Sequence, residues 1–192
     1  MKLYNKTKYP NDLLENLLVE AGKSVGARTS NVIVKATSAK QGYHHSYGTA
    51  HRADYVYEWF LSSRAYKKNS TELKKRMIST DGGYYTITIP NPFIPQWVKD
   101  SDIYPHWLEA HCYDGISLVE SIFRVACHEW RHIKQYQDRL FNFRDKQEQA
   151  KHHDNRSWEK DAIKASSKTL SKPRDKTQEA ILNLALWIEA NR

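Results

Sequence analysis

The sequence predicts an α+β fold in which a small, mostly antiparallel sheet packs against one long helix. Two observations support this fold class. Apolar residues recur at helical spacing across residues 118–133, and residues 84–89 have the composition of a β-strand. With 192 residues, 40% of them apolar and 12% aromatic, the chain is long enough for one cored domain and too short for two full ones. We therefore expect a single domain over residues 1–192, with its central part at about 28–170.

The N-terminal third is expected to contain one helix followed by strands. Asn11 and Asp12 can cap a helix whose leucines recur at helical spacing until Gly22 and Gly26 interrupt the pattern. Residues 32–34 and 55–57 are rich in valine, isoleucine and tyrosine, which is typical of strands. A hairpin or two neighbouring strands would fit this segment.

Helices are expected to dominate the C-terminal half. The turn at residues 81–83 leads into the strand at 84–89, and prolines end that strand. A long amphipathic helix is predicted from about residue 117 to residue 140. The polar residues 142–155 let the chain reverse direction, and another helix begins near Asn155. Pro173 precedes a C-terminal amphipathic helix at about 176–190.

Charge and cysteine content limit the possible partners and sites. The net charge of +8, from 30 basic and 22 acidic residues, could attract nucleic acid, an anionic surface or acidic proteins, but identifies none of them. Two cysteines are too few for a disulfide framework or a cysteine zinc cluster. The N-terminus has no signal-like apolar segment, and no apolar run is long enough to span a membrane. We expect a cytoplasmic monomer without a membrane partner.

The long helix contains the pattern H-E-x-x-H, formed by His128, Glu129 and His132. Two histidines four residues apart on a helix lie about 40° apart around its axis, so both imidazoles can reach one metal ion. Zinc held in this way lowers the pKa of a bound water to about 7 and polarises a carbonyl group. Glu129 lies on the same side and can accept the proton of that water. We therefore expect one zinc ion per chain, with Glu129 as the general base.

A catalytic zinc ion takes three protein ligands and leaves one position open, so the site needs a third ligand. Glu159 is the favoured candidate, because it begins a predicted helix and Ala162, one turn later, would allow this helix to approach the first closely. His152 and His153 are the alternatives, since imidazole is an equally good ligand, but no periodicity sets their direction. An acidic residue in a first helical turn is also favoured by the helix dipole without any metal.

H-E-x-x-H followed after a short connection by E-x-x-A resembles the small gluzincin-type metallopeptidases, including minimal forms with little more than the catalytic core. The resemblance covers roughly residues 84–170. It implies a zincin-like fold in which His128, His132 and Glu159 bind zinc, and peptide hydrolysis by a zinc-bound water that Glu129 activates. It also implies a strand beside the metal helix, on whose edge an extended substrate pairs. Residues 84–89 are the candidate for that edge.

Two parts of such a site are left open by the sequence. Thermolysin-like members have an aspartate four residues after the ligand glutamate, but this position is Ile163 here, with Asp161 as the nearest acid. The sequence therefore does not identify the residue that hydrogen-bonds to the outer nitrogen of a metal-binding histidine. Several side chains could donate a hydrogen bond to an oxyanion: Tyr136, His106, His111 and His51. His44, His45 and His51 could bind a second metal ion, but histidines of this kind are more often surface or hydrogen-bonded residues.

Two other classes of function fit parts of the sequence. Lysine and arginine interleave with tyrosine, histidine and tryptophan, which fits a nucleic-acid-associated protein or a SprT-like protease that acts on DNA-bound proteins. No recognised nucleic-acid-binding module is present. A non-catalytic interaction protein that retains a zincin framework is the third interpretation. The intact Glu129 favours the enzyme, for which a peptide or protein is the expected substrate.

Overall fold

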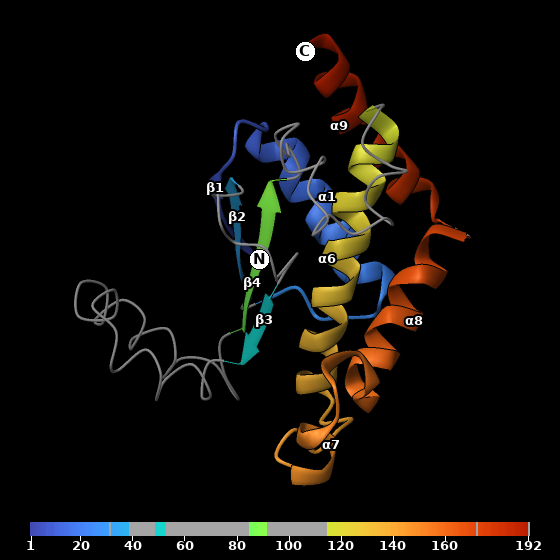
Figure 1. Ribbon diagram of the computed structural model, residues 1–192. Helices are drawn as coiled ribbons and strands as arrows, with labels where there is room; N and C mark the ends of the chain where they lie inside the picture. Colours follow the sequence, from blue (N-terminus) through green and yellow to red (C-terminus); the bar gives the residue numbers. More distant parts are fainter. Residues whose placement is uncertain (31, 39–48, 53–84, 92–114, 172, 192) are drawn as a thin grey trace, which may run out of the picture.

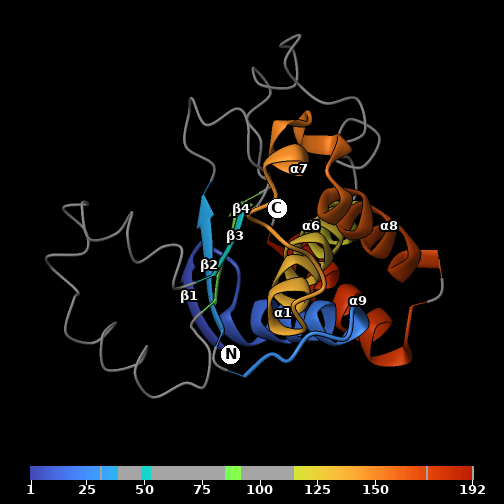
Figure 2. The same ribbon diagram turned by 90° about the horizontal axis from the view of Figure 1, so that it is seen from below.

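A computed structural model describes residues 1–30, 32–38, 49–52, 85–91, 115–171 and 173–191 (Figure 1). The elements are β1 (Lys2–Lys6), α1 (Asn11–Ser24), β2 (Val32–Ser38), β3 (Thr49–Arg52), β4 (Tyr85–Asn91), α6 (Gly115–Gln137), α7 (Lys146–Ala150), a 3-10 turn (His153–Asn155), α8 (Ser157–Ser171) and α9 (Asp175–Ala190). Figures 1 and 2 show the sheet on one side of α1 and α6, with α8 and α9 on the other side. Helices α1 and α6 therefore form the middle of the molecule.

The sheet differs from the predicted one. Its order is β1-β2-β4-β3, and two of its three strand pairs, β1 with β2 and β2 with β4, are parallel. Only β3 pairs antiparallel, with β4. Helix α1 connects β1 to β2, and a helical crossover of this kind joins parallel strands. Together with the predominance of helices among the described residues, this arrangement overturns the predicted zincin-like α+β class with a mostly antiparallel sheet.

Two strands also have positions that the sequence did not indicate. The predicted edge strand at residues 84–89 falls in β4, which lies inside the sheet between β2 and β3, so that prediction is wrong. Within the described residues, β3 is the edge strand that pairs with β4. Strand β1 was missed because its residues alternate between exposed and half-buried without a fully apolar face. The strand predicted at residues 55–57 lies outside the described residues.

The helices agree with the sequence pattern. The six apolar residues that predicted the long helix are all buried in α6: Leu118, Val119, Ile122, Ala126, Trp130 and Ile133. They pack with the leucines of α1 and with the apolar face of α9 in one core. Gly22 of α1 lies at the closest approach, where a Cβ atom would be 2.7 Å from Thr29 Cγ2 and 3.0 Å from the Trp130 ring. Only a glycine lets α1 come this close to α6 without displacing these side chains.

A defined cap ends α6 and allows the chain to return along it. Arg139 adopts a left-handed conformation with φ of 51°, and the amide of Leu140 donates to the Gln135 carbonyl at 3.0 Å. This is the hydrogen-bond pattern of a Schellman cap. After α7 and the 3-10 turn, α8 packs along α6, so the chain reverses direction within the polar segment at 142–155, as expected. None of the described helices combines the length and hydrophobicity required to cross a bilayer.

Candidate metal centre

The two histidines of the H-E-x-x-H pattern lie one turn apart on α6 and meet at their Nε2 atoms. The distance between His128 Nε2 and His132 Nε2 is 3.1 Å, and the rings are nearly perpendicular, at 86°. His132 is buried, whereas 23% of the His128 side chain is exposed. The histidine pair therefore has one closed side and one side that solvent can reach.

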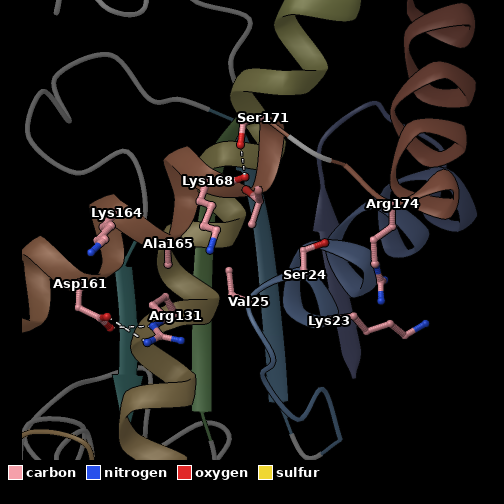
Figure 3. A pocket seen from close by; sticks show the side chains of 11 residues that line it. Lys23, Ser24, Val25, Arg131, Asp161, Lys164, Ala165, Lys168, Ser171 and Arg174 are labelled. Carbon is pink, nitrogen blue, oxygen red and sulfur yellow. Dashed lines mark hydrogen bonds and ion pairs between the residues drawn. The ribbon is translucent and has the colours of Figure 1, made fainter.

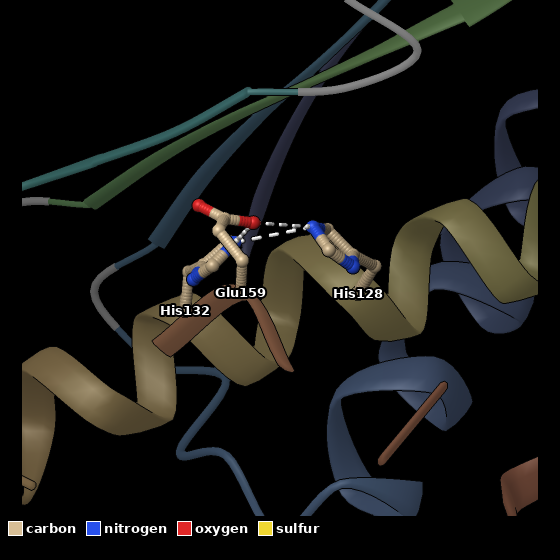
Figure 4. Close-up of side chains that lie close together, drawn as sticks. All are labelled: His128, His132 and Glu159. Carbon is tan, nitrogen blue, oxygen red and sulfur yellow. Dashed lines mark hydrogen bonds and ion pairs between the residues drawn. The ribbon is translucent and has the colours of Figure 1, made fainter. Parts of the chain in front are cut away.

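Glu159 joins this pair from the first turn of α8. Its Oε2 atom lies 3.4 Å from His128 Nε2 and 3.2 Å from His132 Nε2 (Figure 4). Ala162, one turn further, is fully buried, and its small side chain allows α8 to pack closely against α6. The structure thus brings together the three residues that the sequence nominated as metal ligands.

The three facing atoms have the spacing of one face of a tetrahedral coordination sphere. Zinc bonds to nitrogen and carboxylate oxygen are about 2.0–2.2 Å long, so tetrahedral ligands lie about 3.3–3.6 Å apart. The observed separations are 3.1, 3.2 and 3.4 Å. Glu159 Oε2 is also buried and accepts no hydrogen bond of good geometry. A buried carboxylate oxygen left in this way costs free energy that a cation would offset, so these residues fit a zinc ion.

The charges at the site suit the binding of a cation. Burial acts to raise the pKa of Glu159, but the imidazoles of His128 and His132 outweigh it and hold the pKa well below its usual range. Burial acts to lower the pKa of His132, but the carboxylates of Glu159 and Glu129 reverse the direction and raise it. A proton and a metal ion would thus compete for His132, and cation binding would weaken as the pH falls.

Gln135 fixes the orientation of His132. Both hydrogens of its amide nitrogen are used, one donated to the Trp158 carbonyl and one to Asp161 Oδ2, each at 2.8 Å. Its Oε1 atom must therefore face His132 Nδ1, which lies at 2.9 Å and donates the hydrogen. With its proton on Nδ1, neutral His132 presents the lone pair of Nε2 to the site. This is the tautomer that a metal ligand needs.

Gln135 fills the role that the sequence left open, and Asp161 supports it from behind. The Arg131 guanidinium holds the Asp161 carboxylate with two hydrogen bonds, at 2.7 and 3.0 Å. Sequence reasoning missed Gln135, although its position offers a signal. It follows His128 by seven residues, which places it on the same face of α6. A fully buried glutamine on that face is a candidate for holding a ligand.

Substitution of Gln135 by leucine is expected to lower zinc affinity by about 10–100-fold, the range typical of lost outer hydrogen-bond partners. The physical reason is that His132 loses the acceptor that selects its tautomer. Competition with a chromogenic chelator would measure the change. Gln137→Leu is the matched control, because within the described part of the chain the Gln137 side chain hydrogen-bonds only to the Arg28 backbone, at 2.7 and 2.9 Å. Equal losses of affinity in both variants would contradict this role for Gln135.

The other candidates from the sequence lie around the centre or outside the described residues. His153 is 60% exposed and contacts the other oxygen of Glu159, with Nε2 3.2 Å from Oε1, while its Nδ1 lies 3.0 Å from Asp154 Oδ1. His152 is exposed, and the ring of Tyr136 packs against Phe143. The backbone of His51 lies in β3, where it pairs with Thr86. Four predicted candidates fall outside the described residues: His44, His45, His106 and His111.

Glu129, the expected general base, lies between the two histidines in the sequence, and its side chain is buried. Burial raises the pKa of its carboxyl, and the negative charge of Glu159 adds to this effect, although His132 and His128 oppose it. A carboxyl group with a raised pKa holds a proton more strongly than an ordinary glutamate.

No known family, curated protein or solved structure matches the chain, so the comparisons with known proteins add nothing to the description of this site.

Proposed function

We propose that the protein is a zinc-dependent hydrolase that cleaves peptide bonds. The observation that carries the proposal is the triangle of His128 Nε2, His132 Nε2 and Glu159 Oε2, whose sides measure 3.1, 3.2 and 3.4 Å. Three protein ligands with one accessible side are the arrangement of a catalytic zinc site, whereas a structural site takes four. The partial exposure of His128 provides the accessible side.

Five residues of the chain have a defined part in this proposal. His128, His132 and Glu159 hold the metal ion, and Gln135 keeps His132 in the required tautomer. A bound zinc ion supplies Lewis-acid chemistry, acting on a water molecule and on the carbonyl of the substrate. Glu129 accepts the proton of the attacking water and passes it to the leaving amine. The raised pKa of Glu129 makes its carboxylate a stronger base than an ordinary glutamate, which favours transfer of the proton from water.

We place the substrate along β3 rather than along the strand that the sequence suggested. Strand β3 is the end of the described sheet and lies against α6, the helix that carries the two histidines. An extended peptide can add to such a strand through backbone hydrogen bonds, which would align its carbonyl groups beside the site. The preference for a peptide over another carbonyl substrate comes from the resemblance to gluzincin-type metallopeptidases.

The test is zinc-dependent hydrolysis of an unfolded protein mixture in water enriched in oxygen-18. The expected result is a set of new peptides, detected by mass spectrometry, whose C-termini carry the heavy isotope. Activity should be lost on chelation and return when zinc is added. A chain that binds zinc but yields no labelled product would support a non-catalytic metal protein instead. A chain that remains metal-free in excess zinc would overturn the metal site itself.

A further inference from the structure

A second concave site lies on the helical side of the molecule, apart from the metal centre. It has a volume of about 490 Å³ and is formed by the end of α1, by Arg131 in the second half of α6, by residues along α8 and by the residue that precedes α9 (Figure 3). None of the three proposed metal ligands lines this pocket. Five basic side chains and one acid do: Lys23, Arg131, Lys164, Lys168, Arg174 and Asp161.

The positive charge of the pocket exceeds the negative charge around it. Asp161 pairs with Arg131, and the buried Glu20, which does not line the pocket, pairs with both Lys23 and Arg174. The pKa of Glu20 is lowered, since its basic neighbours outweigh the effect of burial, so this carboxylate is charged at neutral pH. Five positive charges therefore face two negative ones. The excess lies mainly on α8.

Lys164 and Lys168 carry this excess without compensation. They are one turn apart on α8, and neither forms an ion pair or a side-chain hydrogen bond within the described part of the chain. Like charges at this spacing destabilise a helix slightly. Lys168 lies in the last turn, where a cation offsets the helix dipole, but Lys164 does not have this role. An anionic ligand would provide the missing counter-charge.

Arg131 extends the same cationic surface from α6. A guanidinium has five N–H donors, and Asp161 takes only two of those of Arg131. The side chain is 21% exposed and held in place by that bidentate pair, so its remaining donors are pre-oriented. A rigid guanidinium beside two unpaired ammonium groups is the donor set that recognises phosphate oxygens. Val25 and Ala165 add apolar surface to the same pocket.

We propose that this pocket binds a small molecule that carries at least two phosphate groups. Lys164, Lys168 and Arg131 contact the phosphates, while the apolar surface of Val25 and Ala165 accommodates the organic part. A volume of about 490 Å³ falls within the range of small-ligand sites and is larger than one phosphate group requires. The pocket contains none of the proposed metal ligands, but it adjoins their support, because Arg131 holds Asp161, which accepts from Gln135. Binding in this pocket does not depend on the proposed hydrolysis.

Calorimetric titration with pyrophosphate tests the proposal. The full-length chain is titrated with chelator present, so that pyrophosphate cannot bind through a metal ion, and circular dichroism verifies the fold of each variant. One saturable site per chain is expected. The double variant Lys164→Gln/Lys168→Gln should bind at least about tenfold more weakly, because it loses two charge-assisted hydrogen bonds. Both lysines are exposed, and neither belongs to the metal centre.

The control variant Lys160→Gln/Lys176→Gln removes the same charge from exposed positions on α8 and α9 that do not line the pocket. Its affinity should change by less than about twofold, because distant exposed charges are screened at physiological ionic strength. Absence of saturable binding to the wild-type chain, or equal weakening in both variants, would overturn the proposal. A single-stranded oligonucleotide that displaces pyrophosphate and is weakened alike by both variants would identify a nucleic-acid surface instead.

Discussion

The Glu129→Gln variant is expected to retain its zinc and to lose peptide hydrolysis by about 10²–10⁴-fold in kcat, the contribution typical of a general base. Glutamine has nearly the same shape as glutamate but cannot accept the proton of the attacking water. The side chain is buried, and glutamine places no charge at this position. Initial rates on one peptide, together with zinc content by mass spectrometry, would measure both effects.

Glu120→Gln serves as the matched control for this variant. Glu120 is on the same helix but nine residues earlier, which places it on the opposite side of α6 from Glu129. The control should keep both its zinc and its activity. Unchanged activity in Glu129→Gln would remove Glu129 from the mechanism, and an equal loss in both variants would indicate a general effect on the helix.

The second expected result is that each wild-type chain binds one zinc ion. The affinity for zinc should fall sharply in three variants: His128→Ala, His132→Ala and Glu159→Ala. Each substitution removes one corner of the triangle of coordinating atoms. The loss of zinc affinity should be larger than the roughly 10–100-fold loss caused by removal of an outer hydrogen-bond partner, because a direct bond to the metal is lost. Chelator competition would measure the affinities. Zinc should also raise the thermal stability of the wild-type chain but not that of the three variants.

His153→Ala and His152→Ala are the controls, since both histidines were alternatives for the third ligand. His152 is exposed, so its variant should retain zinc with nearly unchanged affinity. His153 contacts the second oxygen of Glu159, so its variant should lose no more than the roughly 10–100-fold that follows from removal of an outer partner. The opposite pattern, with zinc retained by Glu159→Ala and lost from His153→Ala, would move the third ligand to the turn before α8. Circular dichroism of each metal-free variant separates loss of the site from loss of the fold.

The sequence alone determined the long helices and the histidine pair of the candidate centre. The apolar positions of α6 repeat with the period of a helix, and they predicted both its burial and the common face of His128 and His132. Helical periodicity is local, since residues three and four apart are neighbours whatever the rest of the chain does. Glu159 was nominated by the same local reasoning, from its place in a first helical turn and from the small residue that follows it.

Tertiary structure decided the sheet, the third corner of the centre and its support. Strand direction depends on how distant segments are connected, and the crossover through α1 makes β1 and β2 parallel, which no local pattern shows. Only the packing of α8 on α6 separates Glu159 from His152 and His153 as the residue that faces both imidazoles. The same packing brings Asp161 to Gln135. Each of these contacts joins residues far apart in sequence, where periodicity carries no information.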